Sequence, residues 1–164
     1  MNEQSKNGVY VDMMCDALKR KKQILQVLLD QTRLQETLLR DEEMDPEQFN
    51  ITIEKKGTQI EELNKIDEGF ESLFKYVEKE ITSNRLAYKE KIQKMQQLIG
   101  EVSELGIRIQ ALEHQNSVHF EVYLANQRKK IRDFHVSNKT ASSYYQNMAN
   151  VHKPDQSYFF NETM

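Results

Sequence analysis

Residues 49–81 read FNITIEKKGTQIEELNKIDEGFESLFKYVEKEI, and their pattern predicts the fold class. Its apolar residues recur in alternating steps of three and four, which is the spacing of a heptad-like seam on one face of an α-helix. Only Lys56 and Asp67 interrupt the stripe. The stripe consists of Phe49, Ile53, Ile60, Leu63, Phe70, Phe74, Val77 and Ile81. The pattern predicts a helix over about residues 46–81.

The residues that flank this stretch carry signals for the two ends of the helix. Asp45 can cap the N-terminus, Pro46 suits the first helical position, and Gln48 stands where the partner of a capping box belongs. Residues 82–84 read Thr-Ser-Asn, which favours a turn because short polar side chains bond to the nearby backbone.

A second helix is predicted on the N-terminal side, over about residues 12–43. Its stripe weakens at Thr32 and Gln35, where polar residues occupy positions at which apolar ones are expected. The apolar members are Met14, Leu18, Ile24, Leu25, Leu28, Leu38 and Leu39.

A third helix is predicted over about residues 85–135, with Gly106 on its stripe, where it could admit a close neighbour at a cost of about 1 kcal/mol of helix propensity. The stripe consists of Tyr88, Ile92, Met95, Ile99, Val102, Ile109, Leu112, Phe120, Tyr123, Ile131 and Phe134. Short connections predict antiparallel neighbours, so the fold class is all-α: an elongated antiparallel three-helix bundle or coiled coil.

The third helix is longer than its neighbours, at about 75 Å against about 48 and 54 Å at 1.5 Å per residue. We therefore expect it to overhang the bundle beyond about residue 121, leaving an apolar stripe for a partner to cover. A bend that folds these residues back, or self-association into a weak homodimer, would cover the stripe equally well. The partner-binding candidates are Phe120, Tyr123, Leu124, Ile131, Phe134, Tyr144 and Tyr145.

The amino-acid composition of the two chain ends differs from that of the predicted helical bundle, residues 12–135. Residues 1–11 are polar and predict a flexible N-terminus. Residues 136–164 are also polar, contain Pro154, and predict a mostly disordered tail. Tyr144 and Tyr145 are unusual in such a tail and are interpreted as docking residues.

Composition narrows the class of protein further. The 164 residues fit one domain, and the net charge of -3 favours neither nucleic acid nor an anionic membrane as partner. Cys15 is the only cysteine, so no internal disulfide forms, which is typical of a reducing compartment. No apolar run approaches the roughly 20 residues that span a bilayer, so membrane insertion is not expected. A cytoplasmic location is predicted.

The sequence offers no residue set for catalysis, for a cofactor or for a metal. The five glycines form no phosphate-binding pattern. None of the four histidines follows a glutamate by three residues, as a di-iron bundle site would require. The acidic residues 41–45 lie at a helix junction and lack the spacing of a calcium loop, so a solvated junction is the preferred interpretation. We therefore expect a protein that is not an enzyme.

Two basic runs remain. Residues 19–22 (KRKK) favour a solvated helix face. Residues 128–132 (RKKIR) neighbour the expected partner surface and could orient an acidic partner. Nucleic-acid binding would need a basic balance or a known reading motif, and the chain has neither.

The order of these segments resembles the FlgN-type flagellar export chaperones over roughly residues 12–150. A lysine-rich helix is followed by the acidic junction MDPEQFN, and a long third helix closes in NQRKKIRDFHVSNKTASSYYQNM. The segments EELNKIDEGFESLF and KTASSYYQNM carry more of the resemblance than the heptads do.

The resemblance implies a cytoplasmic chaperone for flagellar type III secretion, without cofactor or enzymatic activity. Such proteins bind the C-terminal helical regions of hook-filament junction proteins and deliver them to the export gate membrane protein. The resemblance also implies that the C-terminal part of the chain contacts partners. A structural, homo-oligomeric coiled-coil adaptor is the alternative that the residues leave open.

Overall fold

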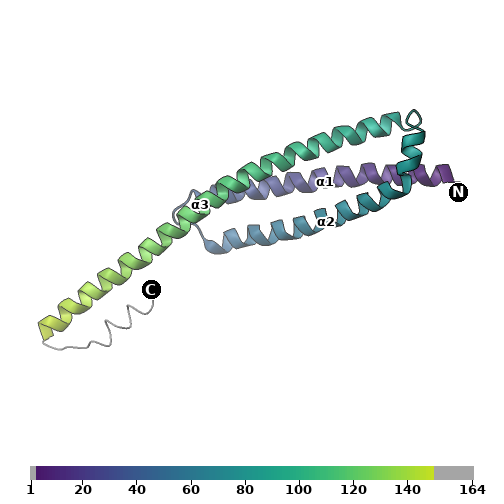
Figure 1. The fold of residues 1–164 in the computed structure, drawn as a ribbon. Coiled ribbons are helices and arrows are strands. Elements are labelled where there is room, and N and C mark those ends of the chain that lie inside the picture. Colours follow the sequence, from purple (N-terminus) through teal and green to yellow (C-terminus); the bar gives the residue numbers. More distant parts are fainter. Residues whose placement is uncertain (1–2, 150–164) are drawn as a thin grey trace. The chain divides into compact units, whose positions relative to one another are not determined.

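A computed structural model describes the backbone of residues 3–149 and the side chains of residues 6–133 (Figure 1). The described chain is all-α and consists of three helices: α1 (Glu3–Leu39), α2 (Pro46–Ser83) and α3 (Lys89–Ala149). It divides into two compact units, residues 1–117 and 118–164, so that α3 contributes its first half to one unit and its second half to the other.

In the first unit, α1 and α2 run antiparallel. The Nζ of Lys21 lies 2.6 Å from a carboxylate oxygen of Asp67, and the Nε2 of Gln35 donates to the Oγ1 of Thr52 over 2.9 Å. Residue numbers that rise on α1 therefore pair with numbers that fall on α2. This arrangement follows from the short connection between the two helices, as the sequence predicts.

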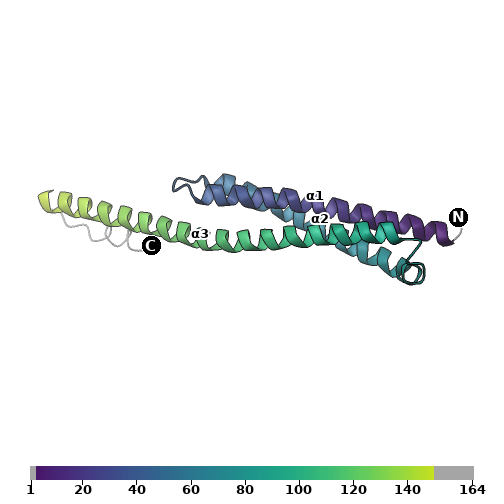
Figure 2. The ribbon, with the colours of Figure 1, turned by 90° about the horizontal axis from the view of Figure 1, so that it is seen from above.

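The first half of α3 runs parallel to α1. Asp12 pairs with Lys91 at 2.5 Å, and Lys22 pairs with Glu101 at 2.8 Å. Both pairs join residues 79 positions apart, so the two helices keep one register over this length. Figures 1 and 2 show α1 running beside both α2 and the beginning of α3.

The start of α2 is fixed by local chemistry. Asp45 is extended, and its side chain accepts a hydrogen bond from the backbone N–H of Glu47 at 3.0 Å. Pro46 occupies the first turn, where its missing N–H costs nothing. The sequence prediction of this helix start is confirmed. At the other end, the backbone N–H of Asn84 bonds to the carbonyl of Glu80 at 2.9 Å and caps the helix.

The apolar core of the first unit is built around α1, which supplies most of its buried residues. One cluster joins all three helices through Val11, Met14, Cys15, Leu18, Val77, Met95 and Leu98. A second consists of Leu25, Leu28, Leu29 and Ile109. Both stripes predicted on α1 and α3 therefore contribute to the core.

The stripe predicted on α2 is buried less than its periodicity suggests. Ile53, Ile60 and Phe74 are all more than 40% exposed, and only Phe49 and Val77 of the stripe are fully buried. The neighbouring polar residues Thr52 and Lys56 are buried instead of Ile53. The apolar stripe is thus wider than the face that α1 covers, and part of it stays open to solvent.

Two helix ends differ from the sequence prediction. α1 begins at Glu3 rather than near residue 12. The ring of Tyr10 lies beside that of Tyr76 in a tilted arrangement with centroids 5.6 Å apart, and Val11 is fully buried in the core, so these residues pack as part of the bundle. α3 continues to Ala149 rather than ending near residue 135. Residues 136–149 are polar but contain neither Gly nor Pro, and polarity alone does not terminate a helix. Residues 1, 2 and 150–164 of the predicted flexible ends lie outside the described residues.

Candidate partner-binding surface

The second unit contains most of the residues that the sequence predicts to bind a partner. Tyr123 and Leu124 lie three and four residues after Phe120, and Ile131 lies seven residues after Leu124, so the four share one face of α3. The rings of Phe120 and Tyr123 stack with centroids 6.3 Å apart and an interplanar angle of 27°. The helix thereby presents a short aromatic and aliphatic face.

The exposure of this face is uneven. Ile131 is 53% exposed, whereas Phe120, Tyr123 and Leu124 are half-buried. Partner binding by these four residues stays a prediction. The predicted residues Phe134, Tyr144 and Tyr145 lie on helical backbone, but their side chains fall outside the described ones.

Two exposed residues on the opposite face escaped the sequence analysis. Val118 and Val122 are 48% and 53% exposed and lie one turn apart. They alternate with members of the predicted stripe along the sequence but lie on the other side of the helix. A prediction based on a single apolar face therefore does not include them. The available signal was the pair of β-branched apolar residues at a spacing of four, which marks a second apolar strip.

A basic run follows these apolar residues directly. Arg128, Lys129, Lys130 and Arg132 are all exposed and surround Ile131. The second unit thus combines exposed aliphatic side chains with a local positive charge. Such a surface is suited to a helical partner that has an apolar face with acidic residues beside it.

The first basic run has a different role from the predicted solvated face. Arg20 pairs with Glu62 of α2 at 3.4 Å, and Lys21 pairs with Asp67 of the same helix. Lys22 pairs with Glu101 of α3, and its hydrogen bond is the largest cause of the lowered pKa of that carboxyl group. The run therefore links α1 to both of its neighbours. This explains Asp67, which breaks the apolar stripe of α2.

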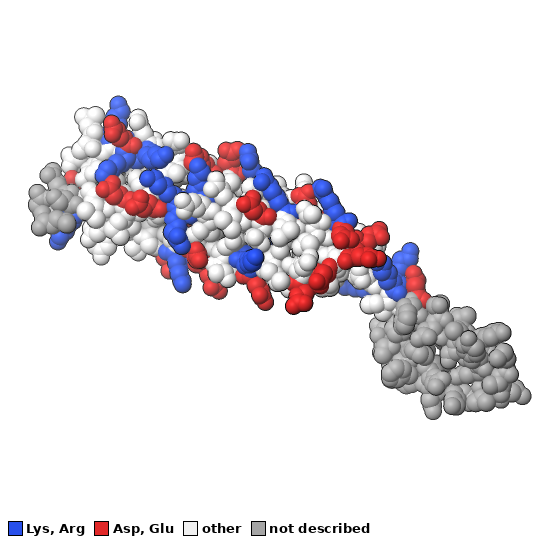
Figure 3. Space-filling view, turned by 180° about the vertical axis from the view of Figure 1, so that it is seen from behind, with Lys and Arg blue, Asp and Glu red and all other residues white. Residues whose placement is uncertain are grey.

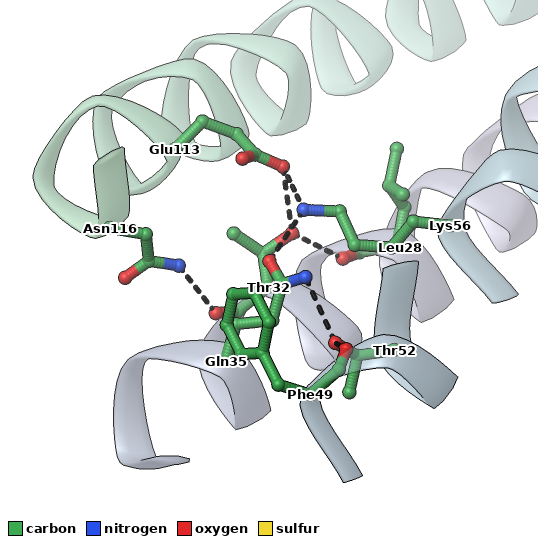
Figure 4. A network of polar contacts seen from close by, with 8 residues as sticks. All are labelled: Leu28, Thr32, Gln35, Phe49, Thr52, Lys56, Glu113 and Asn116. Atoms are coloured by element: carbon green, nitrogen blue, oxygen red, sulfur yellow. Dashed lines mark hydrogen bonds and ion pairs between the residues drawn. The ribbon is translucent and has the colours of Figure 1, made fainter. Parts of the chain in front are cut away.

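A buried polar layer lies near the α1–α2 connection in the first unit (Figure 4). The Nζ of Lys56 donates to the Oε1 of Gln35 at 2.8 Å and also pairs with Glu113 of α3. The Nε2 of Gln35 in turn donates a hydrogen bond to the Oγ1 of Thr52. The polar residues that weaken the predicted stripes of α1 and α2 therefore bond to one another inside the bundle.

The same layer extends to α3 through Thr32 and Asn116. The Oγ1 of Thr32 donates to the carbonyl of Leu28 at 2.7 Å, and the Nδ2 of Asn116 donates to the carbonyl of Thr32 at 2.9 Å. The Oδ1 of Asn116 is buried without a hydrogen-bond partner among the described residues. Because these bonds need matching donors and acceptors, the layer selects one register of the three helices.

Charge on the molecular surface is mixed rather than segregated. Figure 3 shows acidic and basic side chains interleaved over the visible face of the described residues. The acidic residues Asp41, Glu42, Glu43 and Asp45 are exposed at the α1–α2 connection, where Asp41 and Asp45 accept hydrogen bonds from backbone N–H groups. The carboxylates of Asp41 and Asp45 thus hold the backbone of the junction through hydrogen bonds.

Other kinds of site have little support among the described residues. There, no three His, Cys, Asp or Glu side chains converge as metal ligands would. Within residues 3–149, no helix has both the length and the apolar character required to cross a membrane. Cys15 is buried, and burial raises the pKa of its thiol, with the nearby Asp12 carboxylate adding to the effect. A raised pKa lowers the fraction of nucleophilic thiolate.

The candidate surface of the second unit is therefore its helix with exposed apolar residues and a basic run, and the first unit separately leaves part of the α2 stripe exposed. Comparison with protein-family models, with curated proteins and with solved structures finds no match to this chain. A functional assignment thus depends on the residues and contacts described above.

Proposed function

We propose that this chain is a non-enzymatic protein that binds a helical segment of another protein. The observation that carries the proposal is Ile131, which is 53% exposed and stands within the exposed basic residues 128–132, while Val118 and Val122 are exposed on the opposite face of the same helix. Exposed aliphatic residues on a helix, next to charges of one sign, are typical of surfaces that accept an amphipathic helix.

The physical basis is coupled folding and binding. A partner segment that orders on binding loses conformational entropy, which offsets part of the gain from apolar burial. Affinity then stays moderate and release remains fast. A carrier that must later give up its cargo needs this balance, whereas a permanent complex would bury a larger and more apolar interface.

The resemblance to FlgN-type proteins supports a narrower form of the proposal. In this form the chain is a cytoplasmic flagellar export chaperone. It binds the C-terminal helical regions of hook-filament junction proteins and delivers them to the export gate membrane protein.

The direct test is calorimetry with the full chain and the C-terminal helical segment of the junction proteins from the same organism. We expect one-to-one binding with a dissociation constant of about 10 µM or tighter. Ile131→Glu should weaken binding at least about tenfold by placing a charge on the surface. Ile107→Glu is the matched control, because Ile107 is 67% exposed on α3 but belongs to the first unit.

A result in which neither junction segment binds would remove the flagellar proposal. Equal losses for Ile131→Glu and Ile107→Glu would remove the second unit as the binding surface. Truncation after His135 tests whether the last turns of α3 contribute, since it leaves Phe120, Tyr123 and Ile131 in place.

A structural, homo-oligomeric adaptor is the second candidate. The exposed part of the α2 stripe at Ile53, Ile60 and Phe74 favours it, because such a stripe can pair with another helix. The adaptor should form an oligomer whose mass is unchanged by any junction segment. The chaperone should instead form a cargo complex of defined stoichiometry.

A further inference from the structure

The stretch of α3 that belongs to the first unit is held differently at its two ends. Near its start, Ile92, Met95 and Leu98 pack in the apolar cluster that joins all three helices. Further along, Ile109 is buried in the second cluster. Residues 113–117 then read EHQNS, so the last turn before the second unit contains no apolar side chain. This turn is therefore attached through polar groups.

Two side chains of this turn reach the other helices (Figure 4). Glu113 pairs with the ammonium group of Lys56 on α2, and its Oε1 lies 3.5 Å from the Oγ1 of Thr32 on α1. The Nδ2 of Asn116 donates to the backbone carbonyl of Thr32 over 2.9 Å. We call Thr32, Lys56, Glu113 and Asn116 the polar clasp. Along the chain, its α3 members lie just before the second unit begins at Val118.

The bonds of the polar clasp contribute little net free energy to the attachment of α3. The side chain of Lys56 is 10% exposed and Asn116 is 4% exposed, so both have lost most of their water. The Oδ1 of Asn116 gains no hydrogen bond in return among the described residues. Opening returns water to these groups, which offsets the hydrogen bonds that break.

The helix itself is weak at the same place. His114, Asn116 and Ser117 are residue types with a lower helix propensity than Ala, Leu or Glu. Unwinding this turn therefore costs less than unwinding a turn of strong helix formers. Local opening of a protein begins where few apolar contacts are buried. Low apolar burial and low helix propensity thus coincide at residues 113–117.

We propose that the polar clasp is a release point, at which residues 113–117 of α3 detach from α1 and α2 while both apolar clusters stay closed. Because the chain enters the second unit at Val118, a partner or a force that acts on the second unit reaches the first unit through this turn. The clasp then opens first, and the clusters around Met95 and Ile109 keep the three helices together. The proposal concerns the first unit and does not depend on the proposed export function.

A thiol placed under the clasp tests this proposal. Thr32 is fully buried, so Thr32→Cys in a Cys15→Ala chain reacts with a thiol reagent only when this region opens. Cys15 of the natural chain is the comparator, because it lies in the apolar cluster that should stay closed. Each labelling rate is divided by the rate of the same chain unfolded in urea. On this scale we expect Thr32→Cys to be labelled at least tenfold faster than Cys15.

The dependence of labelling on urea separates local opening from global unfolding. Opening a single turn exposes little surface, so the labelling rate of Thr32→Cys should rise only weakly as urea is added below the unfolding transition. The labelling rate of Cys15 should rise steeply over the same range, because its exposure requires the whole cluster to open.

A matched pair of substitutions shows whether the clasp controls the opening. Glu113→Ala, made in the Thr32→Cys chain, takes one acceptor from the buried ammonium group of Lys56 and should raise the labelling rate at least tenfold. Glu104→Ala makes the same change of charge at an exposed position of α3, where the carboxylate pairs with Arg108 along its own helix. It should leave the labelling rate unchanged.

An apolar replacement should hold the turn closed. This variant combines Gln35→Leu, Lys56→Met and Asn116→Leu in the Thr32→Cys chain, so that buried donors and acceptors are removed together. Opening then gains no hydration of buried polar groups, and labelling should slow at least tenfold. Circular dichroism and the urea midpoint verify that the helices remain intact.

Labelling of Thr32→Cys as slow as that of Cys15, with the same dependence on urea, would overturn the proposal, because this region would then open only on global unfolding. Fast labelling that the apolar replacement leaves unchanged would also overturn it, since the clasp would not govern the opening. Should the apolar replacement fail to fold, the matched pair decides, and equal labelling rates for Glu113→Ala and Glu104→Ala would overturn the proposal.

Discussion

Lys56 places an ammonium group inside the first unit, at a position where the heptad pattern expects an apolar residue. Its side chain is 10% exposed and bonds to Gln35 and to Glu113. Buried charge is tolerated only when hydrogen bonds replace the lost water, and here two acceptors do so. The residue therefore contributes more to selecting the helix register than to net stability.

A single and a double variant should show how much the hydrogen bond between Lys56 and Gln35 contributes to stability. Lys56→Met removes the donor to the Oε1 of Gln35, which is buried, and we expect a loss of about 1–3 kcal/mol in the free energy of unfolding. The double variant Lys56→Met with Gln35→Leu removes both partners and should recover most of that loss. Urea unfolding followed by circular dichroism measures both, and equal stability of the two variants would contradict the paired role.

The thiol of Cys15 should be protected by its surroundings. Burial raises its pKa above the ordinary value, and Asp12 raises it further. Because the folded-state pKa lies above the unfolded one, the contribution to stability is complete below the unfolded pKa of about 8.5 and is lost as pH rises through the folded pKa. We expect slow labelling by a thiol reagent at pH 8 and a steep increase in urea. Rapid labelling of the native chain would contradict burial.

At the scale of the helix, Asp45 determines where α2 begins. Its carboxylate accepts from the N–H of Glu47, and its negative charge opposes the positive end of the helix dipole. Asp45→Ala should lower the free energy of unfolding by about 1 kcal/mol. Asp45→Asn keeps the acceptor and should lose less. Glu42→Ala, at an exposed neighbouring position, is the control, and a loss there equal to that of Asp45→Ala would point to overall charge instead of capping.

Gly106 carries a second prediction at this scale. It lies within α3, and a methyl group there would meet no atom within 4 Å. Gly106→Ala should therefore stabilise the monomeric chain by about 0.5–1 kcal/mol, because alanine loses less backbone entropy in a helix. Thermal unfolding of Gly106→Ala and of the natural chain measures this difference, and a lower midpoint for Gly106→Ala would contradict the prediction.

At the scale of the whole molecule, ion pairs join α1 to both neighbours and should make stability depend on pH. The hydrogen bond from Lys22 holds the pKa of Glu101 below its ordinary value. A lowered folded-state pKa gives a stabilising contribution that is present above the unfolded pKa of about 4.3 and is lost as pH falls through the folded value. Urea midpoints at pH 6 and pH 3 should differ less in Glu101→Gln than in the natural chain.

The all-α class, the three helices and the capped start of α2 can all be predicted from the amino-acid sequence. These features depend on local periodicity and on side chains that bond to their own backbone, so they can be read without a tertiary structure. The position of Met14 and Leu18 in the core also follows from the stripe of α1. The sequence placed the candidate surface in the last part of α3, although it passed over Val118 and Val122.

Which part of each stripe is covered depends on how the three helices pack against one another. Periodicity marks a helix face but not its neighbour, so it could not foresee that Ile60 and Phe74 stay exposed while Thr52 and Lys56 are buried. Nor could it foresee that the polar interruptions of separate helices meet in one hydrogen-bonded layer. Contacts between residues far apart in the chain set these outcomes, because burial depends on the packing of several helices at once.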